Sequence, residues 1–131
     1  MHDFAVISLS DLLTPWEIIE QRVKAALEAD FVLVFYNPRS RRRGWQLGRI
    51  MGMVRELRGA GTPVGVVRNA MRDGQEVMLE SASDLDLSGV DMLSIVLVGN
   101  SQTRLAGGKM ITPRGYMRKY GPSGGCGKTE D

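Results

Sequence analysis

Three nearly continuous apolar runs constrain the fold of this chain more than any other feature of its sequence. They cover residues 31–36, 64–67 and 93–98, and they consist mainly of β-branched, leucine and aromatic residues. Such runs are typical of strands that are buried on both faces, as in sheets with parallel strands. The sequence therefore predicts three buried strands within an α/β domain.

Each apolar run leads into a loop that contains an asparagine and at least one arginine. In open α/β sheets, ligands bind at the carboxyl ends of the strands. The arginine guanidinium binds carboxylates and phosphates in bidentate fashion, which suits an anionic ligand. Asn, Gly and Pro are also ordinary turn residues, so any one of these loops alone is better explained as a turn. The three loops together predict one shared ligand site.

Two segments, one before the first run and one between the first and the second, have the periodicity of amphipathic helices. We expect Thr14 to cap the first helix, with Pro15 at its first position and Glu17 completing a capping box. The predicted helices cover residues 15–29 and 44–58, further strands cover 4–8 and 75–80, and residues 81–89 form a polar helical turn or a loop.

This alternation predicts a three-layer α/β domain over residues 1–120, with a five-stranded mixed, mostly parallel sheet. Residues 121–131 are rich in glycine and poor in apolar groups, so we expect a disordered tail.

Composition excludes several classes of protein. The 131 residues suit one domain, and they contain neither an apolar stretch near 18 residues nor a signal peptide, so we expect a cytoplasmic protein with no membrane contact. A single cysteine, Cys126, excludes an internal disulfide, and no cluster of residues has metal-ligand spacing. The only histidine, His2, lies at the amino terminus, which disfavours a serine or cysteine triad.

The basic residues leave two interpretations open besides an enzyme. The run Arg41-Arg42-Arg43 fits an arginine-rich module that binds nucleic acid, although few aromatic residues for base stacking lie nearby. The strand-end loops also fit a non-catalytic domain that binds an anionic metabolite.

Four longer motifs carry a resemblance to a known family. They are Tyr36-Asn37-Pro38-Arg39-Ser40-Arg41-Arg42-Arg43-Gly44-Trp45-Gln46, Thr62-Pro63-Val64-Gly65-Val66-Val67-Arg68-Asn69-Ala70, Val98-Gly99-Asn100-Ser101-Gln102-Thr103-Arg104, and Met110-Ile111-Thr112-Pro113-Arg114-Gly115-Tyr116. In this order they resemble the carboxyl-terminal half of the precorrin-3B C17-methyltransferases, which are tetrapyrrole methylases. The segment from Ile7 to Trp16 is also similar to that family.

The resemblance implies an S-adenosylmethionine-dependent enzyme of cobalamin biosynthesis, which methylates precorrin-3B at C17 and couples this step to ring contraction. Family members have two α/β domains, and nothing in this chain resembles the amino-terminal one. The chain is therefore expected to be an isolated domain, a truncated gene product or one half of a split enzyme, and to be inactive alone.

The resemblance also implies the roles of individual residues and the partners. Loops of the carboxyl-terminal domain contribute to the methyl-donor site, and the arginine-rich segments suit the carboxylates of the tetrapyrrole. No general acid or base is identifiable, and no metal is implied. The implied partners are the tetrapyrrole, the missing amino-terminal domain and a second copy in a homodimer. The implied cofactor-binding residues are Tyr36, Asn37, Pro38, Arg68, Asn69, Ala70, Gly99 and Asn100, and the implied substrate-binding residues are Arg39, Ser40, Arg41 and Arg104.

Overall fold

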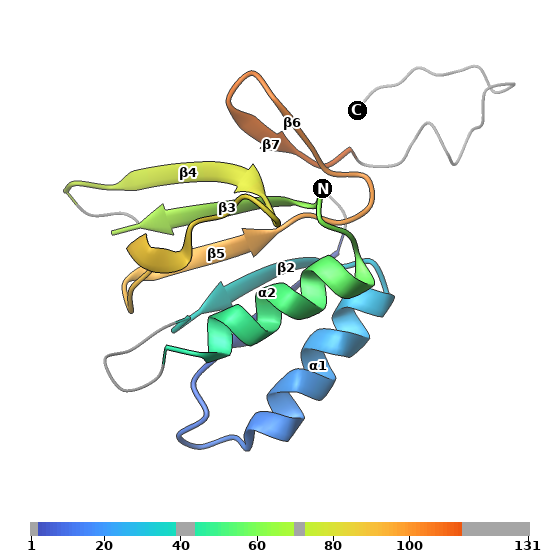
Figure 1. Ribbon diagram of the computed structural model, residues 1–131, viewed down its shortest axis with the longest axis vertical. Helices are drawn as coiled ribbons and strands as arrows, with labels where there is room; N and C mark the ends of the chain where they lie inside the picture. Colours follow the sequence, from blue (N-terminus) through green and yellow to red (C-terminus); the bar gives the residue numbers. More distant parts are fainter. Residues whose placement is uncertain (1–2, 39–43, 70–72, 114–131) are drawn as a thin grey trace, which may run out of the picture.

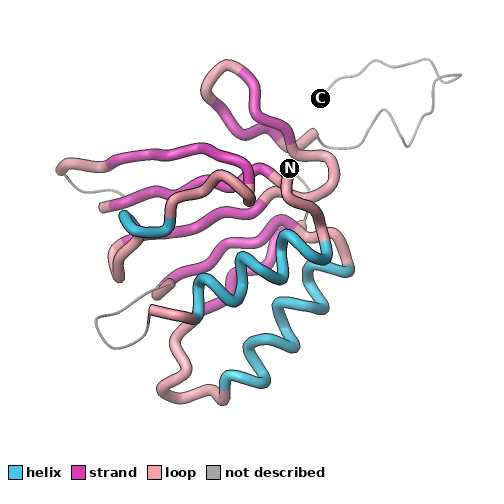
Figure 2. Tube along the Cα trace, viewed as in Figure 1, coloured by secondary structure: helices cyan, strands magenta, loops and turns pink. Residues whose placement is uncertain are grey.

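The computed structural model describes residues 3–38, 44–69 and 73–113, and the predicted tail at 121–131 lies outside these ranges. The arrangement of the elements is shown in Figure 1 and, by type of secondary structure, in Figure 2. In chain order they are β1 (Phe4–Ser8), α1 (Trp16–Glu28), β2 (Val32–Tyr36), α2 (Gln46–Leu57), β3 (Pro63–Arg68), β4 (Glu76–Ser81), the 3₁₀ turn η1 (Leu87–Gly89), β5 (Ser94–Val98), β6 (Arg104–Ala106) and β7 (Lys109–Ile111).

The five longer strands form one mixed sheet in the order β1-β2-β5-β3-β4. The predicted number of strands in this sheet, five, is confirmed. Only β1 and β2 pair in parallel, whereas the β2–β5, β5–β3 and β3–β4 pairs are antiparallel. The prediction of a mostly parallel sheet is therefore wrong. For β3 and β4 the physical reason is the short connection between them, because parallel neighbours need a crossover of about a dozen residues or more.

Both helices cover the same face of the sheet, so the domain has two layers and not the predicted three (Figure 1). The core lies between them. Leu33 and Phe35 of β2 point into it and are fully buried. Val96 of β5 and Val66 of β3 are fully buried as well. From the helices, the largest buried side chains are Ile19, Val23, Leu47, Ile50, Met51 and Val54.

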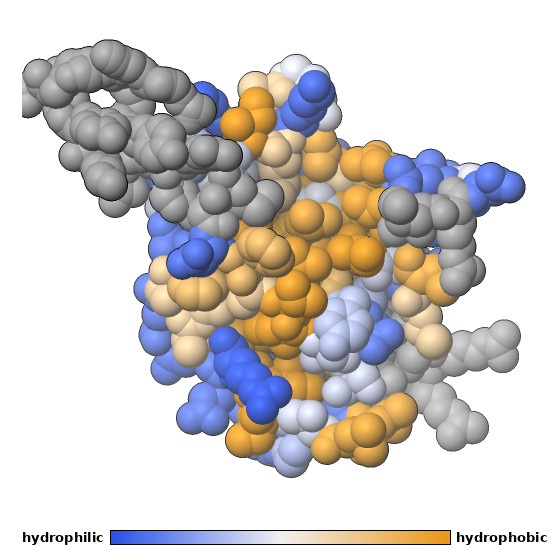
Figure 3. All heavy atoms as spheres, turned by 180° about the vertical axis from the view of Figure 1, so that it is seen from behind, coloured by the Kyte–Doolittle hydropathy of each residue, from blue (hydrophilic) through white to orange (hydrophobic). Residues whose placement is uncertain are grey.

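No described helix covers the opposite face of the sheet, which we call the open face, but the side chains of β2, β3 and β5 on it are mostly buried or half-buried, in keeping with the prediction of three buried strands. Its side chains alternate with those of the core, and on the two edge strands Val6 and Val77 are 56% and 59% exposed. Orange, apolar side chains gather over this face in Figure 3. The hairpin of β6 and β7 lies beside β3, where Met110 approaches Gly65.

The boundaries of the predicted helices are confirmed to within two residues, but the start of α1 differs. Pro15 precedes the first turn of α1, and no side chain makes a capping hydrogen bond to this end of the helix. Pro15 has an extended backbone, with ψ at 143°, so the helix begins one residue later than predicted and Thr14 makes no cap.

A charged cluster joins the two helices. Arg49 of α2 donates to the Glu20 carboxylate of α1 at 2.7 Å, and the Trp16 indole donates to the same carboxylate at 2.7 Å. The hydrogen bond from Arg49 holds the pKa of Glu20 below its ordinary value. The rings of Trp16 and Trp45 meet edge to face at 4.9 Å. These contacts bring the amino ends of both helices together.

Candidate functional site

The sheet has two edges that differ in chemistry. β1, β2 and β3 run in the same direction, because β1 is parallel to β2 and β5 is antiparallel to both β2 and β3. Their carboxyl ends, Ser8, Tyr36 and Arg68, therefore lie at one edge, which we call the carboxyl edge. β5 ends at the other edge, beside the first residues of β2 and β3, and we call this the opposite edge.

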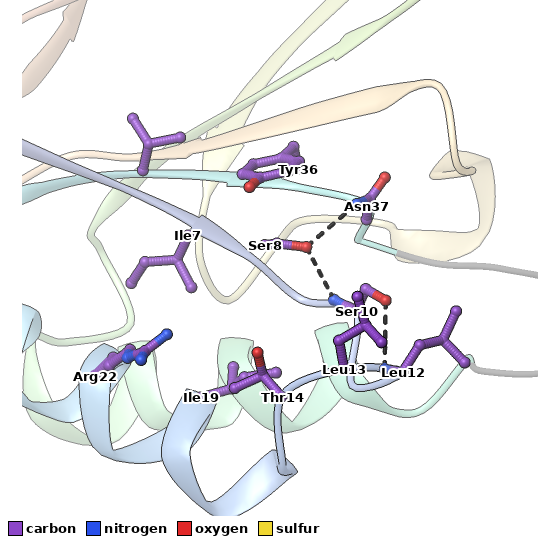
Figure 4. Close-up of a pocket in the computed structure, with 11 residues that line it drawn as sticks. Ile7, Ser8, Ser10, Leu12, Leu13, Thr14, Ile19, Arg22, Tyr36 and Asn37 are labelled. Atoms are coloured by element: carbon purple, nitrogen blue, oxygen red, sulfur yellow. Dashed lines mark hydrogen bonds between the residues drawn. The ribbon is translucent and has the colours of Figure 1, made fainter.

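A pocket of about 630 Å³ lies at the carboxyl edge, around the end of β1 (Figure 4). Its volume falls within the range of about 300–1,000 Å³ that is usual for small-molecule sites. Apolar side chains and hydroxyl groups line most of it, and Arg22 is its one charged side chain among the residues that the structure describes. The lining residues are Val6, Ile7, Ser8, Ser10, Leu12, Leu13, Thr14, Ile19, Arg22, Tyr36 and Asn37.

Hydrogen bonds fix the two loops that form the rim of this pocket. The Asn37 amide donates to the Ser8 hydroxyl oxygen at 3.2 Å, and that oxygen also accepts the Ser10 backbone N–H at 3.2 Å. The Leu9 backbone N–H donates to the Tyr36 carbonyl at 3.0 Å. Asn37 has a φ of 52°, a left-handed conformation that asparagine tolerates better than most residues. Tyr36 is 44% exposed and forms a wall of the pocket.

The second predicted loop lies at the same edge, two strands away from Tyr36. Asn69 repeats the left-handed turn of Asn37, with a φ of 52°. The Arg68 guanidinium, however, makes ion pairs with Glu76 at 3.0 Å and with Asp91 at 3.6 Å. Both ion pairs link side chains of this domain, from β3 to β4 and to the segment before β5.

The third predicted loop lies at the opposite edge of the sheet. The three loops therefore do not meet at one site, contrary to the prediction. Gly99 donates to the Pro63 carbonyl at 2.9 Å. Asn100 is buried, and its side-chain oxygen accepts the Gln102 N–H at 2.9 Å and the Thr103 hydroxyl at 3.1 Å. The Asn100 N–H donates in turn to the Thr103 hydroxyl oxygen at 2.9 Å. This pattern is that of a self-contained polar turn.

Hydrogen bonds from the Arg58 side chain link this turn to α1. Its guanidinium donates to the carbonyls of Gly99 at 2.7 Å, Leu27 at 3.0 Å and Ala26 at 3.3 Å. Burial lowers the pKa of Arg58, and the nearby Asp30 carboxylate acts in the other direction. Asp30 also accepts the Ser101 backbone N–H at 2.8 Å. The opposite edge is therefore a structural network of hydrogen bonds, in which the two terminal nitrogens of Arg58 have partners and its buried Nε has none.

The remaining predicted site residues divide into two groups. Pro38 is buried just after the pocket turn, and Arg104 is exposed on β6, beyond the opposite edge. Arg39, Ser40, Arg41 and Ala70 lie outside the described residues. The sequence reasoning missed the pocket residues contributed by the loop after β1 and by α1. The adjacent leucines Leu12-Leu13, in the loop after a strand that ends at this edge, are the sequence signal that could have indicated them.

The described residues supply neither a metal site nor a membrane span. Within residues 3–38, 44–69 and 73–113, no group of three or more His, Cys, Asp or Glu side chains could hold a metal ion. The helices in these ranges are also too short and too polar to cross a membrane.

Comparisons with known proteins point in one direction, although no protein-family model matches the chain. The chain is 55% identical over 116 residues to a Salmonella typhimurium protein named "Probable cobalt-factor III C(17)-methyltransferase". It is 40% identical over 104 residues to the "Precorrin-3B C(17)-methyltransferase" of a Sinorhizobium species. The crystal structure of the methyltransferase CobJ superposes with a TM-score of 0.80 at 38% identity.

These matches cover most of this chain and about half of each relative. The Salmonella match covers 88% of this chain and 48% of that protein, and the Sinorhizobium match covers 79% and 41%. The CobJ match covers 86% of this chain and 47% of that structure. The chain belongs to the family of cobalt-factor III and precorrin-3B C17-methyltransferases, and it corresponds to the carboxyl-terminal part of its members.

Proposed function

We propose that this chain supplies the carboxyl-terminal half of an S-adenosylmethionine-dependent methyltransferase that acts at C17 of precorrin-3B or cobalt-factor III in cobalamin biosynthesis. The observation that carries the proposal is the 55% identity to the Salmonella relative across 88% of this chain. The proposed reaction includes the ring contraction that the resemblance implies. The rest of the enzyme, in this proposal, is an amino-terminal domain that completes the site.

The proposed place of the methyl donor is the pocket at the carboxyl edge. Its apolar wall suits a nucleoside, because the exposed Tyr36 ring offers a face for the adenine and the hydroxyls of Ser8 and Ser10 lie nearby. When bound, S-adenosylmethionine supplies the methyl group through an electrophilic sulfonium. The chain's own part is to hold the donor in line with its acceptor, since such orientation is worth effective molarities of about 10⁵ M or more.

Half of a two-domain cleft cannot enclose the donor, so we expect weak or undetectable S-adenosylmethionine binding and no turnover by the isolated chain. The described residues do not fully enclose the pocket, which is what this expectation requires.

A chimera tests the proposal. In it, this chain replaces the matching carboxyl-terminal part of the Salmonella relative, and methyl transfer from labelled S-adenosylmethionine to the tetrapyrrole is measured. We expect C17-methylated product from the chimera and none from either half alone. A folded chimera that binds the tetrapyrrole but never transfers a methyl group would contradict the proposal.

The proposed contacts to the tetrapyrrole concern Arg39 and Arg41, which lie outside the described residues and follow the Tyr36-Asn37-Pro38 turn. Guanidinium groups attract the substrate's carboxylates and repel the donor's sulfonium. A charge-assisted hydrogen bond is worth roughly 1.5–3 kcal/mol. In the chimera, Arg39→Ala or Arg41→Ala should therefore raise the tetrapyrrole KM by about tenfold to a hundredfold.

The matched readout for these variants is the affinity for S-adenosylhomocysteine, which should stay within about twofold of the unsubstituted chimera. A collapse of donor affinity with an unchanged tetrapyrrole KM would assign these arginines to the donor instead.

A further inference from the structure

We propose that Arg22 of α1 binds the carboxylate at the amino-acid end of the methyl donor, so that Tyr36 and Arg22 hold the two ends of one molecule. This inference rests on the proposed function, because it takes the pocket at the carboxyl edge as the donor site. Arg22 lies outside the motifs that carry the family resemblance, so its role follows from its place in the pocket.

The Arg22 guanidinium has no hydrogen-bond or ion-pair partner within the described part of the chain. By contrast, Arg49 donates to a carboxylate, and Arg55 and Arg58 donate to backbone carbonyls. None of the eleven described residues that line the pocket is acidic. A ligand that brings an anion into the pocket therefore gains a charge-assisted hydrogen bond that the protein itself does not make.

Arg22 lies on the side of α1 that borders the pocket. Ile19 also lines the pocket, because residues three positions apart share one face of a helix. Arg22 is exposed, so a ligand can reach its guanidinium. In Figure 4 this guanidinium lies below β1, near Ile7, whereas the Tyr36 ring lies above that strand. The pocket therefore has an aromatic end and a cationic end.

The methyl donor has two ends of matching chemistry. Its adenine is a flat base that stacks on an aromatic ring such as Tyr36. Its amino-acid end carries a carboxylate, which the guanidinium fork of Arg22 can bind in bidentate fashion. The hydroxyl oxygens of Ser10 and Thr14, which belong to the same lining, can accept hydrogen bonds from the ammonium group beside that carboxylate.

The positive sulfonium of the donor does not oppose this contact. Coulomb energy falls with distance, and a carboxylate in contact with the guanidinium is closer to it than the sulfonium, which lies several bonds further along the ligand. Arg22 differs in this respect from Arg39 and Arg41, whose proposed partners are the carboxylates of the tetrapyrrole, because Arg22 lines the proposed donor pocket itself.

The test is a calorimetric titration of two ligands into the two-domain chimera. S-adenosylhomocysteine carries the amino-acid end, and 5′-methylthioadenosine has the same nucleoside and a thioether but lacks that end. We expect Arg22→Met to raise the dissociation constant of S-adenosylhomocysteine by about tenfold and to leave that of 5′-methylthioadenosine within about twofold. Tenfold is the lower end for a charge-assisted hydrogen bond, because Arg22 is exposed to solvent. Arg22→Lys keeps the charge without the fork, so it should weaken binding less than Arg22→Met.

The matched control is Lys24→Met, which removes the same charge from the same helix. Lys24 lines the separate groove between α1 and α2, so both dissociation constants should stay within about twofold. Circular dichroism should show the same fold in all the variants.

Equal weakening of both ligands by Arg22→Met would overturn the inference. So would an unchanged constant for S-adenosylhomocysteine, and a simultaneous rise of the tetrapyrrole KM would then assign Arg22 to a carboxylate of the substrate. An unsubstituted chimera that binds neither ligand would contradict the proposed donor pocket itself, and this inference with it.

Discussion

Replacing Gly99 with alanine is expected to lower the free energy of unfolding of this chain by about 2–3 kcal/mol, which is large for a single methyl group. A Cβ atom at Gly99 would lie 2.5 Å from Thr103 Cβ and 2.6 Å from Thr103 Cγ2. Thr103 cannot easily move away. Its hydroxyl accepts the Asn100 N–H at 2.9 Å and lies 2.6 Å from the Thr112 hydroxyl oxygen.

Thermal unfolding followed by circular dichroism measures this effect. For a domain of this size about 1 kcal/mol corresponds to roughly 4 °C, so the melting temperature should fall by about 10 °C. Gly61→Ala is the matched control, because a Cβ there meets nothing within 4 Å and should leave the melting temperature nearly unchanged. Equal melting of the two variants would show that the Gly99 turn adapts and that the crowding at Thr103 is unimportant.

This prediction bears on function because Gly99 and Asn100 are two of the residues that the family resemblance implies for the methyl-donor site. In the structure, the close approach of Thr103 explains the glycine, and the bonds within the turn explain the asparagine. The sequence pattern Gly-Asn-Ser-Gln-Thr therefore has a structural reason that is independent of any ligand.

The strands and helices were largely predictable from sequence, because the apolar runs and the helical periodicity report directly on burial. Leu33, Phe35, Val66 and Val96 form the core as their runs indicated. Strand direction was predicted wrongly, as mostly parallel, although the chain contains a signal against this. Residues 69–75 are too few for a crossover between parallel strands, so β4 must run against β3.

Two other features had weaker signals. The β6–β7 hairpin was missed, although its turn is Gly107-Gly108 and both glycines have the positive φ, 58° and 74°, that tight hairpins require. The composition of the three strand-end loops, each with asparagine and arginine, predicted one shared site. Composition alone could not show that Arg58 and Asp30 engage the third loop from the opposite edge. That information depends on contacts between segments that are distant in sequence.

The second prediction with a large effect concerns Tyr36, the aromatic wall of the pocket. In the two-domain chimera, Tyr36→Ala should raise the dissociation constant for S-adenosylhomocysteine by about tenfold to a hundredfold. The physical reason is that stacking of a base on an aromatic side chain is worth roughly 1–3 kcal/mol. Tyr36 is 44% exposed, so the fold should tolerate its removal.

Phe4 provides a closely matched comparison. It is also an aromatic residue on the open face, 53% exposed, but it begins β1 at the opposite edge of the sheet. Truncation of either ring therefore removes similar apolar surface from that face, and only truncation of Tyr36 changes the pocket.

The most direct test of the account is a calorimetric titration of S-adenosylhomocysteine into the two chimeras that carry Tyr36→Ala and Phe4→Ala. If the donor binds at the carboxyl edge, Tyr36→Ala will weaken binding by at least about tenfold, and Phe4→Ala will leave it within about twofold of the unsubstituted chimera. If instead Phe4→Ala weakens binding as much as Tyr36→Ala does, or if Tyr36→Ala has no effect, the donor does not bind in this pocket.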